Sequence, residues 1–389
     1  MKDVSIIIPA YNEAKFIEKA ILSAVSQAEF VIVSDNCSTD GTQEICKRLA
    51  KEFSNLVFYE QESNIGAIRN FEFLLSKIHT KYLLHIGAHD FISEDYVSTL
   101  KKSLENSPEA VVSYAPYFSI DDNGKILDEN LLNEFSEKLV SANVSERILA
   151  FTQNRSFIFT IFGLMKTQIF KKYFSPNLAI AGVDCLLLSQ FISEGIFVRV
   201  PEARFYRRVI TRHDSAEEYM KRITGNAQTI QYDLSYMCSQ QFELLKSKSK
   251  NNLEEQQRVL NDFSLSMQSM HGNFCHRSLD ETLNKLSQTD EKYILYGAGT
   301  DSSYIMNKLY NKILFIVDND INKHNTIKDG IEIKSLTALT QSSDRIIISL
   351  LNRFELISKT LISEYNINPS RLVSPIDFSI KIDIDSSII

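Results

Sequence analysis

The sequence predicts an α/β protein with two separate, mostly parallel sheets. Strand-length apolar runs alternate with amphipathic stretches at both ends of the chain, and a long polar, helix-like stretch without strand signals separates them. Such alternation is typical of parallel sheets that carry helices on both faces. We therefore expect three parts: residues 1–215, a helical connector over 216–290 and a smaller α/β domain over 291–389.

The first sheet is expected to begin near the start of the chain. Residues 4–9 (VSIIIP) form a continuous apolar run, as strands buried on both faces do. Residues 16–25 place apolar side chains at three- and four-residue steps, which predicts an amphipathic helix that Asn12 is suited to cap. Further strands are expected at residues 30–34, 56–59 and 82–86, with helices between them.

The pattern changes after residue 110. A strand-like stretch over 110–120 runs into Asp-Asp-Asn-Gly at 121–124, and residues 125–127 return, which predicts a hairpin. Residues 157–165 form another buried run, and 197–201 another strand. Later in the chain, strands of the second sheet are expected at residues 293–296, 313–317 and 345–350.

Composition excludes several classes of protein. The 389 residues carry a formal net charge of -7, so nucleic-acid binding through a basic stripe is not expected. The five cysteines are scattered without a Cys-x-x-Cys pair, which favours a reducing, cytoplasmic setting. We expect no secretory signal, and no run reaches the roughly 18 apolar residues of a spanning helix. Peripheral contact with the inner face of the membrane stays open.

Polar residues gather where the first four predicted strands end, at 9–13, 34–36, 64–70 and 89–90. The carboxyl ends of neighbouring parallel strands converge on one crevice. There Tyr11 can stack on a base, Asp35 can accept from it, Arg69 can neutralise phosphate, and Asp90 can hold Mg²⁺ or Mn²⁺. Each residue alone is also an ordinary turn or cap residue, but the series predicts a nucleotide-diphosphate site.

These stretches resemble one enzyme family. Residues 5–13 (SIIIPAYNE), 31–42 (VIVSDNCSTDGT) and 64–70 (NIGAIRN) are similar to the family 2 glycosyltransferases, which have the GT-A fold. The resemblance covers about the first 215 residues and implies a sugar transferase with a nucleotide-activated donor, preferably a UDP-sugar. It implies donor-binding roles for Pro9, Tyr11, Glu13, Asp35, Asn64, Arg69, His89 and Arg208.

The chain departs from the family at the fourth strand. The family usually has an Asp-x-Asp-Asp signature there, whereas this chain has Gly87-Ala88-His89-Asp90. The resemblance implies that Asp90 is the remaining metal ligand. His89 is either a further ligand or a donor to phosphate or sugar, and the alternative is that it only caps the turn. Loss of metal dependence, or of activity, stays open.

Two later segments also resemble the family. Asp184 matches the catalytic base of inverting members, which takes the proton of the acceptor hydroxyl; the alternative is a helix N-cap. Residues 205–213 resemble a loop over the diphosphate, which implies that His213 is a second metal or phosphate contact assisted by Arg208. Alternatively, this stretch is a strand end and a solvated basic loop.

The second α/β region carries a partial dinucleotide fingerprint. Gly297 and Gly299 lie between a predicted strand and helix, and Asp318 closes the next strand, but Ser302 replaces the third glycine. The region resembles small Rossmann-like domains attached to sugar-modifying acyltransferases and methyltransferases. We expect a nucleotide or dinucleotide at Gly297, Gly299 and Asp318, or else a packing or oligomerisation module in which the glycines make a tight turn.

The leading hypothesis is an inverting glycosyltransferase that adds a sugar to a surface glycan such as lipopolysaccharide or capsule. Its acceptor would be a glycan or a lipid-linked glycan, and a homo-oligomer stays open. One alternative is a non-catalytic nucleotide-sugar-binding or scaffolding relative, suggested by the carboxylates missing before Asp90. The other is a dinucleotide-dependent enzyme centred on residues 297–318.

Overall fold

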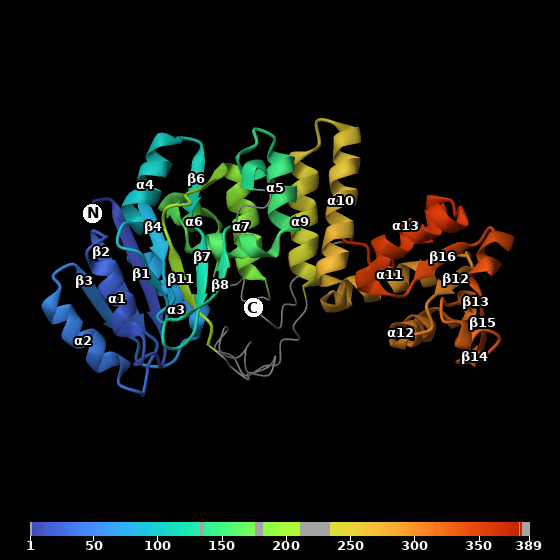
Figure 1. The fold of residues 1–389 in the computed structure, drawn as a ribbon, viewed down its shortest axis with the longest axis horizontal. Helices are drawn as coiled ribbons and strands as arrows, with labels where there is room; N and C mark the ends of the chain where they lie inside the picture. Colours follow the sequence, from blue (N-terminus) through green and yellow to red (C-terminus); the bar gives the residue numbers. More distant parts are fainter. Residues whose placement is uncertain (1, 133–135, 176–181, 211–233, 381, 383–389) are drawn as a thin grey trace. The chain divides into compact units, whose positions relative to one another are not determined.

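The computed structural model of the chain describes residues 2–132, 136–175, 182–210, 234–380 and 382 (Figure 1). The described residues up to 210 belong to one compact unit and those from 234 to another. The helices expected in the connector belong to the second unit, together with the second sheet. The domain boundaries at residues 215 and 290 stay a prediction.

The first unit is built around a seven-stranded sheet in the order β10-β6-β9-β4-β1-β2-β3. Strands β1 to β4 are mutually parallel, and β9 runs antiparallel between β4 and β6. This arrangement confirms the mostly parallel sheet. The strands are β1 (Val4–Ala10), β2 (Phe30–Asp35), β3 (Leu56–Glu60), β4 (Tyr82–His85), β6 (Ala110–Tyr114), β9 (Leu164–Lys166) and β10 (Ile196–Arg199).

The helices of this unit follow the predicted alternation. Helix α1 buries four apolar residues at three- and four-residue spacing, as an amphipathic helix does. Asn12 does not cap α1, because its side-chain oxygen accepts the N–H of Thr39 instead. The helices are α1 (Ile17–Val25), α2 (Thr42–Glu52), α3 (Ala67–Ser76), α4 (Tyr96–Asn106), α5 (Val144–Gln153), α6 (Thr167–Tyr173) and α7 (Val183–Glu194).

A second, four-stranded sheet in the same unit has the order β5-β11-β7-β8. Its strands are β5 (Phe91–Ile92), β7 (Tyr117–Ile120), β8 (Ile126–Asn130) and β11 (Phe205–Arg208). Strands β7 and β8 pair antiparallel, which confirms the predicted hairpin. Because β11 pairs with β5, this sheet brings Arg208 beside the turn that carries Asp90.

The second unit contains a six-stranded sheet in the order β14-β15-β13-β12-β16-β17. From β15 to β17 along this order, every strand is parallel to its neighbours. The order β15-β13-β12-β16-β17 is the strand order of a Rossmann sheet. The strands are β12 (Tyr293–Tyr296), β13 (Ile313–Val317), β14 (Ile327–Lys328), β15 (Ile331–Lys334), β16 (Arg345–Ile348) and β17 (Leu372–Val373). The helices are α9 (Ser235–Lys248), α10 (Leu253–His271), α11 (His276–Ser287), α12 (Thr300–Leu309) and α13 (Phe354–Tyr365).

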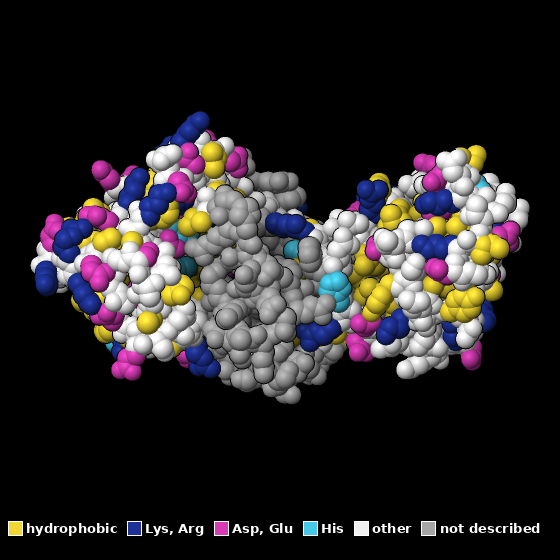
Figure 2. Space-filling view, turned by 90° about the horizontal axis from the view of Figure 1, so that it is seen from below, with side chains coloured by type: hydrophobic (Ala, Val, Ile, Leu, Met, Phe, Trp, Pro, Cys, Tyr) yellow, Lys and Arg dark blue, Asp and Glu magenta, His cyan; other side chains and the backbone are white. Residues whose placement is uncertain are grey.

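The described surface carries both signs of charge. In Figure 2, basic and acidic side chains are interspersed over the visible face of each unit. Among the described helices, none combines the length and the apolar character that crossing a membrane requires.

Candidate active site

Three of the predicted polar clusters meet at one edge of the first sheet. Strand β1 lies between β2 and β4, so the carboxyl ends of all three are neighbours. Tyr11, which follows β1, is 39% exposed, whereas Asp35, which ends β2, is fully buried. The turn with His89 and Asp90 follows β4. The edge therefore offers an aromatic ring and an imidazole beside buried carboxylates.

Asp35 closes the turn after β2. One oxygen of its carboxylate accepts the backbone N–H of Ser38 and the side-chain amide of Gln43, each at 2.8 Å, and the other accepts the Ser38 hydroxyl. Sequence reasoning missed both partners, although an Asp followed three residues later by a Ser is a turn pattern. The contact of Asp35 with a base stays a prediction.

Asn64 is drawn to the same edge by an amide pair. The side-chain N–H of Asn36 donates to the Asn64 oxygen at 2.9 Å, and the Asn36 oxygen accepts the N–H of Ile65 at 2.9 Å. Arg69 is exposed on α3 and makes no hydrogen bond or ion pair within the described part of the chain, while Pro9 is half-buried in β1. Their contacts with a donor stay predictions.

His89 is held by Glu13. Its Nδ1 lies 2.9 Å from Glu13 Oε1, and its Nε2 lies 3.9 Å from Asp90 Oδ1. Glu13 is 7% exposed, whereas the His89 side chain keeps 28% of its surface accessible. The imidazole is therefore oriented by a buried carboxylate yet open to a ligand. No sequence pattern announces this pair, because its members lie 76 residues apart.

Asp90 is buried and turned inward. It is 2% exposed, and its Oδ1 accepts the backbone N–H of Arg208 at 2.8 Å. Burial raises the pKa of Asp90 to about 6, against the lowering effect of His89 and of that N–H. A Cβ at Gly87 would lie 2.5 Å from Asp90 Oδ2. The loss of the usual side chain at residue 87 therefore makes room for this carboxylate.

Arg208 holds the turn that carries His89 and Asp90. It is 4% exposed, its Nε donates to the carbonyl of His89 at 3.1 Å, and its Nη1 donates to the carbonyl of Asp121. The guanidinium also lies 4.3 Å from the ring centre of Phe16. The visible role of Arg208 is to position His89 and Asp90, and direct contact with a donor stays a prediction.

Asp184 occupies the first turn of α7. Gly182, with φ of 78°, is the N-cap of that helix, so the alternative that Asp184 is its N-cap is wrong. The Asp184 side chain is open at the surface, and the surrounding protein raises its pKa by excluding part of the water. Within the described ranges, no hydrogen bond joins it to Glu13, His89 or Asp90. His213 lies outside the described residues.

The described residues hold no ready-made group of ligands for a divalent ion. Nowhere among them do three His, Cys, Asp or Glu side chains converge as metal ligands. Mg²⁺ is usually held by one or two carboxylates together with substrate phosphates and water, and the carboxylate at this turn, Asp90, is 2% exposed. The metal roles of Asp90 and His213 therefore stay predictions.

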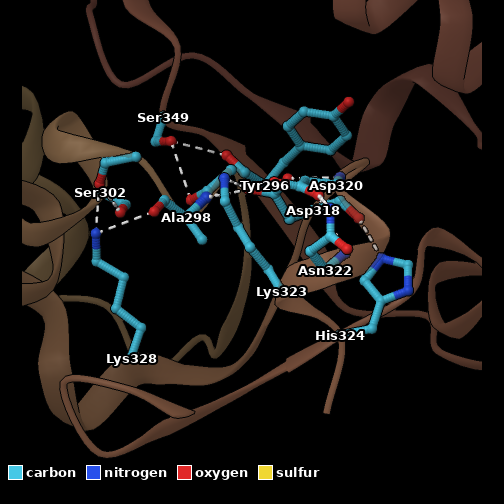
Figure 3. Close-up of polar contacts among 12 residues, drawn as sticks. Tyr296, Ala298, Ser302, Asp318, Asp320, Asn322, Lys323, His324, Lys328 and Ser349 are labelled. Carbon is cyan, nitrogen blue, oxygen red and sulfur yellow. Dashed lines mark hydrogen bonds and ion pairs between the residues drawn. The ribbon is translucent and has the colours of Figure 1, made fainter. Parts of the chain in front are cut away.

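The second unit brings its predicted residues together (Figure 3). Gly297 has φ of +97°, and a Cβ there would lie 2.6 Å from a methyl carbon of Leu350. Asp318 accepts the N–H of Ala298 at 2.8 Å and the ammonium of Lys323 at 3.1 Å. The turn is thus tight and tied to the end of β13.

The polar groups of this turn satisfy one another. Burial would raise the pKa of Asp318, but N–H groups of Asp320 and Ala298 and the charge of Lys323 hold it below its usual value. Lys328 donates to the carbonyls of Ala298 and Gly299 at 3.1 and 2.6 Å. Nucleotide or dinucleotide binding at Gly297, Gly299 and Asp318 stays a prediction.

Similarity to known proteins agrees with the geometry of the first unit. Residues 5–174 match the family model described as glycosyl transferase family 2. Glycosyltransferase GlyA of Streptococcus pneumoniae serotype 4 is 28% identical over 178 residues, 43% of this chain and 25% of GlyA. The minor teichoic acid biosynthesis protein GgaB of Bacillus subtilis is 27% identical over 230 residues, 56% of this chain and 24% of GgaB.

A solved structure supports the fold. S. aureus TarS 1-349, crystallised with UDP-GlcNAc, superimposes with a TM-score of 0.51 over 80% of each chain at 17% identity. This chain spans only about a quarter of the length of the two curated relatives. The matched residues contain all of the β1–β4 edge and its Glu13–His89–Asp90 cluster. The N-terminal region of this chain is a family 2 glycosyltransferase domain with the GT-A fold.

Proposed function

We propose that this protein is an inverting glycosyltransferase that moves a sugar from a nucleotide-diphosphate sugar, preferably a UDP-sugar, to a hydroxyl of a cell-surface glycan. The observation that carries the proposal is the cluster of Glu13, His89 and Asp90 at the carboxyl edge of the sheet, inside the region that matches the family. One curated relative is named for minor teichoic acid biosynthesis, which favours a surface polymer as the acceptor; lipopolysaccharide and capsule are the other surface glycans of this proposal.

In this proposal Asp184 is the base. It takes the proton of the acceptor hydroxyl while that oxygen bonds to the anomeric carbon, and the bond from this carbon to the diphosphate oxygen breaks on the opposite face. The exposure of Asp184 in the first turn of α7 supports this role, because a general base must be within reach of the acceptor hydroxyl. The acceptor, a glycan or lipid-linked glycan, is then released with the new sugar attached in inverted configuration at its anomeric carbon.

The donor would lie along the edge. In this proposal Tyr11 and Pro9 meet the base and ribose, and Arg69, which is exposed, offers charge to the diphosphate. His89, whose Nδ1 lies 2.9 Å from Glu13, donates from its Nε2 to a phosphate or sugar oxygen. No step here is routed through a metal ion.

The test is release of UDP from a panel of UDP-sugars, with Mn²⁺ and with a chelator, in the wild type and in Asp90→Ala. We expect turnover with at least one donor, and its response to the chelator decides the metal prediction. If no nucleotide-sugar raises the melting temperature and no UDP is released, the proposal is wrong, because a bound ligand must stabilise the native state.

One alternative is supported by a specific observation. The alternative, a non-catalytic nucleotide-sugar-binding relative, is favoured by the burial of Asp90, which is 2% exposed and whose Oδ1 already accepts the N–H of Arg208. Binding of a UDP-sugar without any turnover would support that alternative. Cytoplasmic location, peripheral membrane contact and self-association stay predictions.

A further inference from the structure

We propose that the first sheet has a second binding site, for a phosphate-bearing ligand, at the amino end of strand β4, opposite the carboxyl ends that carry the candidate active site. A pocket of about 730 Å³ lies there, a volume typical of small-molecule sites. Its walls are the start of β4, the end of β9 with the start of α6, and the end of α4 with the turn before β6. The catalytic edge lies at the other end of β4, so the two sites are separate.

The pocket is lined by three lysines from separate parts of the chain, Lys81, Lys166 and Lys171. None of them has a carboxylate within 4 Å in the described part of the chain. The carboxylate in the lining belongs to Glu105, and it lies 3.6 Å from the ammonium of Lys101. Three lysines and one carboxylate therefore line the pocket, and this excess of positive charge attracts an anion.

Two of these ammonium groups are fixed in place. Lys166 Nζ donates to the carbonyl of Pro108 at 2.8 Å, and Lys171 Nζ donates to the carbonyl of Ile78 at 2.6 Å. Each ammonium carries three N–H groups, so two remain for a ligand. Burial, and then the charge of Lys81, lowers the pKa of Lys166, as expected where positive charge is uncompensated.

A buried hydroxyl in the same wall also lacks a partner. Thr167 is 6% exposed, and its side-chain oxygen makes no hydrogen bond with any described residue. Buried hydroxyls in native proteins normally have a hydrogen-bond partner. The Thr167 oxygen is covered by protein, so the lysines carry the proposal.

The chemistry of the wall selects phosphate. Lysine binds phosphate as a point charge, and several ammonium groups match the several oxygens of that group. Two sources share this chemistry: a free phosphorylated molecule and the headgroup of an anionic lipid.

The test is calorimetric titration of the full chain with inorganic pyrophosphate, and co-sedimentation with phosphatidylglycerol or phosphatidylcholine vesicles. We expect binding to pyrophosphate or to the phosphatidylglycerol vesicles, weakened at least tenfold in Lys166→Gln/Lys171→Gln. Binding should also weaken as salt rises, because exposed charges are screened. Pyrophosphate alone identifies a free ligand, and anionic vesicles alone identify a headgroup.

The matched control is Lys51→Gln/Lys250→Gln, which removes two exposed lysines outside the pocket. If the double pocket variant does not fold, Lys81→Gln replaces it, because that side chain is exposed and its loss should weaken binding several-fold. Equal binding by pocket and control variants overturns the proposal. Absence of binding to both probes overturns it too.

Discussion

Asp90 and Asp318 occupy similar places in two different sheets, and their environments have opposite effects. Each is buried near the end of a parallel strand, with 2% and 8% of its surface exposed. Asp90 accepts one backbone N–H, from Arg208, and burial raises its pKa to about 6. Asp318 accepts two backbone N–H groups and an ammonium, and its pKa is lowered. Burial acts to raise the pKa of both carboxylates, and the larger set of donors around Asp318 outweighs it there but not at Asp90.

The candidate active site of the first unit and the glycine turn of the second unit also differ in how much accessible surface they offer to a ligand. At the first edge, Tyr11, Arg69 and His89 keep accessible surface for a ligand. At the glycine turn, Lys328 and Asp318 are held by neighbouring groups of the same turn. We therefore expect chemistry at the first edge and a structural role at the second, and the following predictions test that division.

The largest effect is expected for Asp184→Asn. Removal of a general base should lower kcat for sugar transfer by roughly 10²–10⁴-fold, with little change in donor binding. The matched control is Asp301→Asn, which alters the first helical turn of α12 in the other unit. If both variants keep full kcat, Asp184 is not the base; if Asp301→Asn is equally inactive, the division between the edges fails.

Asp90 should make stability fall as the pH rises. Its folded-state pKa of about 6 exceeds the unfolded value near 4, so its contribution is complete below pH 4 and lost as the pH rises through 6. The difference in unfolding free energy between the wild type and Asp90→Asn should shift by about 2–3 kcal/mol over that window. Urea unfolding at several pH values measures it, and a pH-independent difference would contradict the burial of a raised-pKa carboxylate.

The glycine turn gives a matched pair. Gly297→Ala should lower the unfolding free energy by about 2 kcal/mol, because its φ is +97° and the new Cβ would meet Leu350 and Ser349. Gly299→Ala should be close to neutral, since nothing lies within 4 Å of the added carbon. Thermal melts compare them. Loss of NAD(H)-induced stabilisation in Gly299→Ala would instead show a ligand site at this turn.

Asp318→Asn should have a smaller effect than Gly297→Ala, a loss of about 1 kcal/mol at pH 7, because a charge-assisted contact with Lys323 disappears. The sign is opposite to that of Asp90. A lowered pKa stabilises above the unfolded value near 4 and loses its effect as the pH falls. Wild type and variant should therefore converge in acid, and divergence there would refute the comparison.

Periodicity predicted much of the fold because the pattern of a buried strand or an amphipathic helix is contained in a short stretch of sequence. The run at residues 4–9 and the α1 pattern needed no distant information. The run at residues 157–165 was less informative: residues Arg155–Phe162 form a 3₁₀ helix, and only Leu164–Lys166 join the sheet. An apolar run reports burial, but tertiary packing decides its conformation.

The site residues were identified from sequence, but their contacts were not. The Glu13–His89 pair and the Arg208 N–H on Asp90 join residues far apart in the chain, and the pocket lysines come from three separate segments. Local patterns carry no information on such pairs. The buried position of the Asp90 carboxylate also depends on Gly87, because a Cβ there would collide with it. The sequence shows the glycine but does not show this contact.

Strand β11 has a consequence for the order of folding. The hydrogen bond from the Arg208 N–H to Asp90 closes a loop of 118 residues, whereas strands β1 to β4 pair within the first 85. Loop-closure entropy makes contacts of large sequence separation slow to form. During synthesis, strands β1 to β4 can pair early, but the His89–Asp90 turn is completed only after residue 208 has been made. Catalytic competence should therefore appear as a late kinetic phase, after the main sheet has formed.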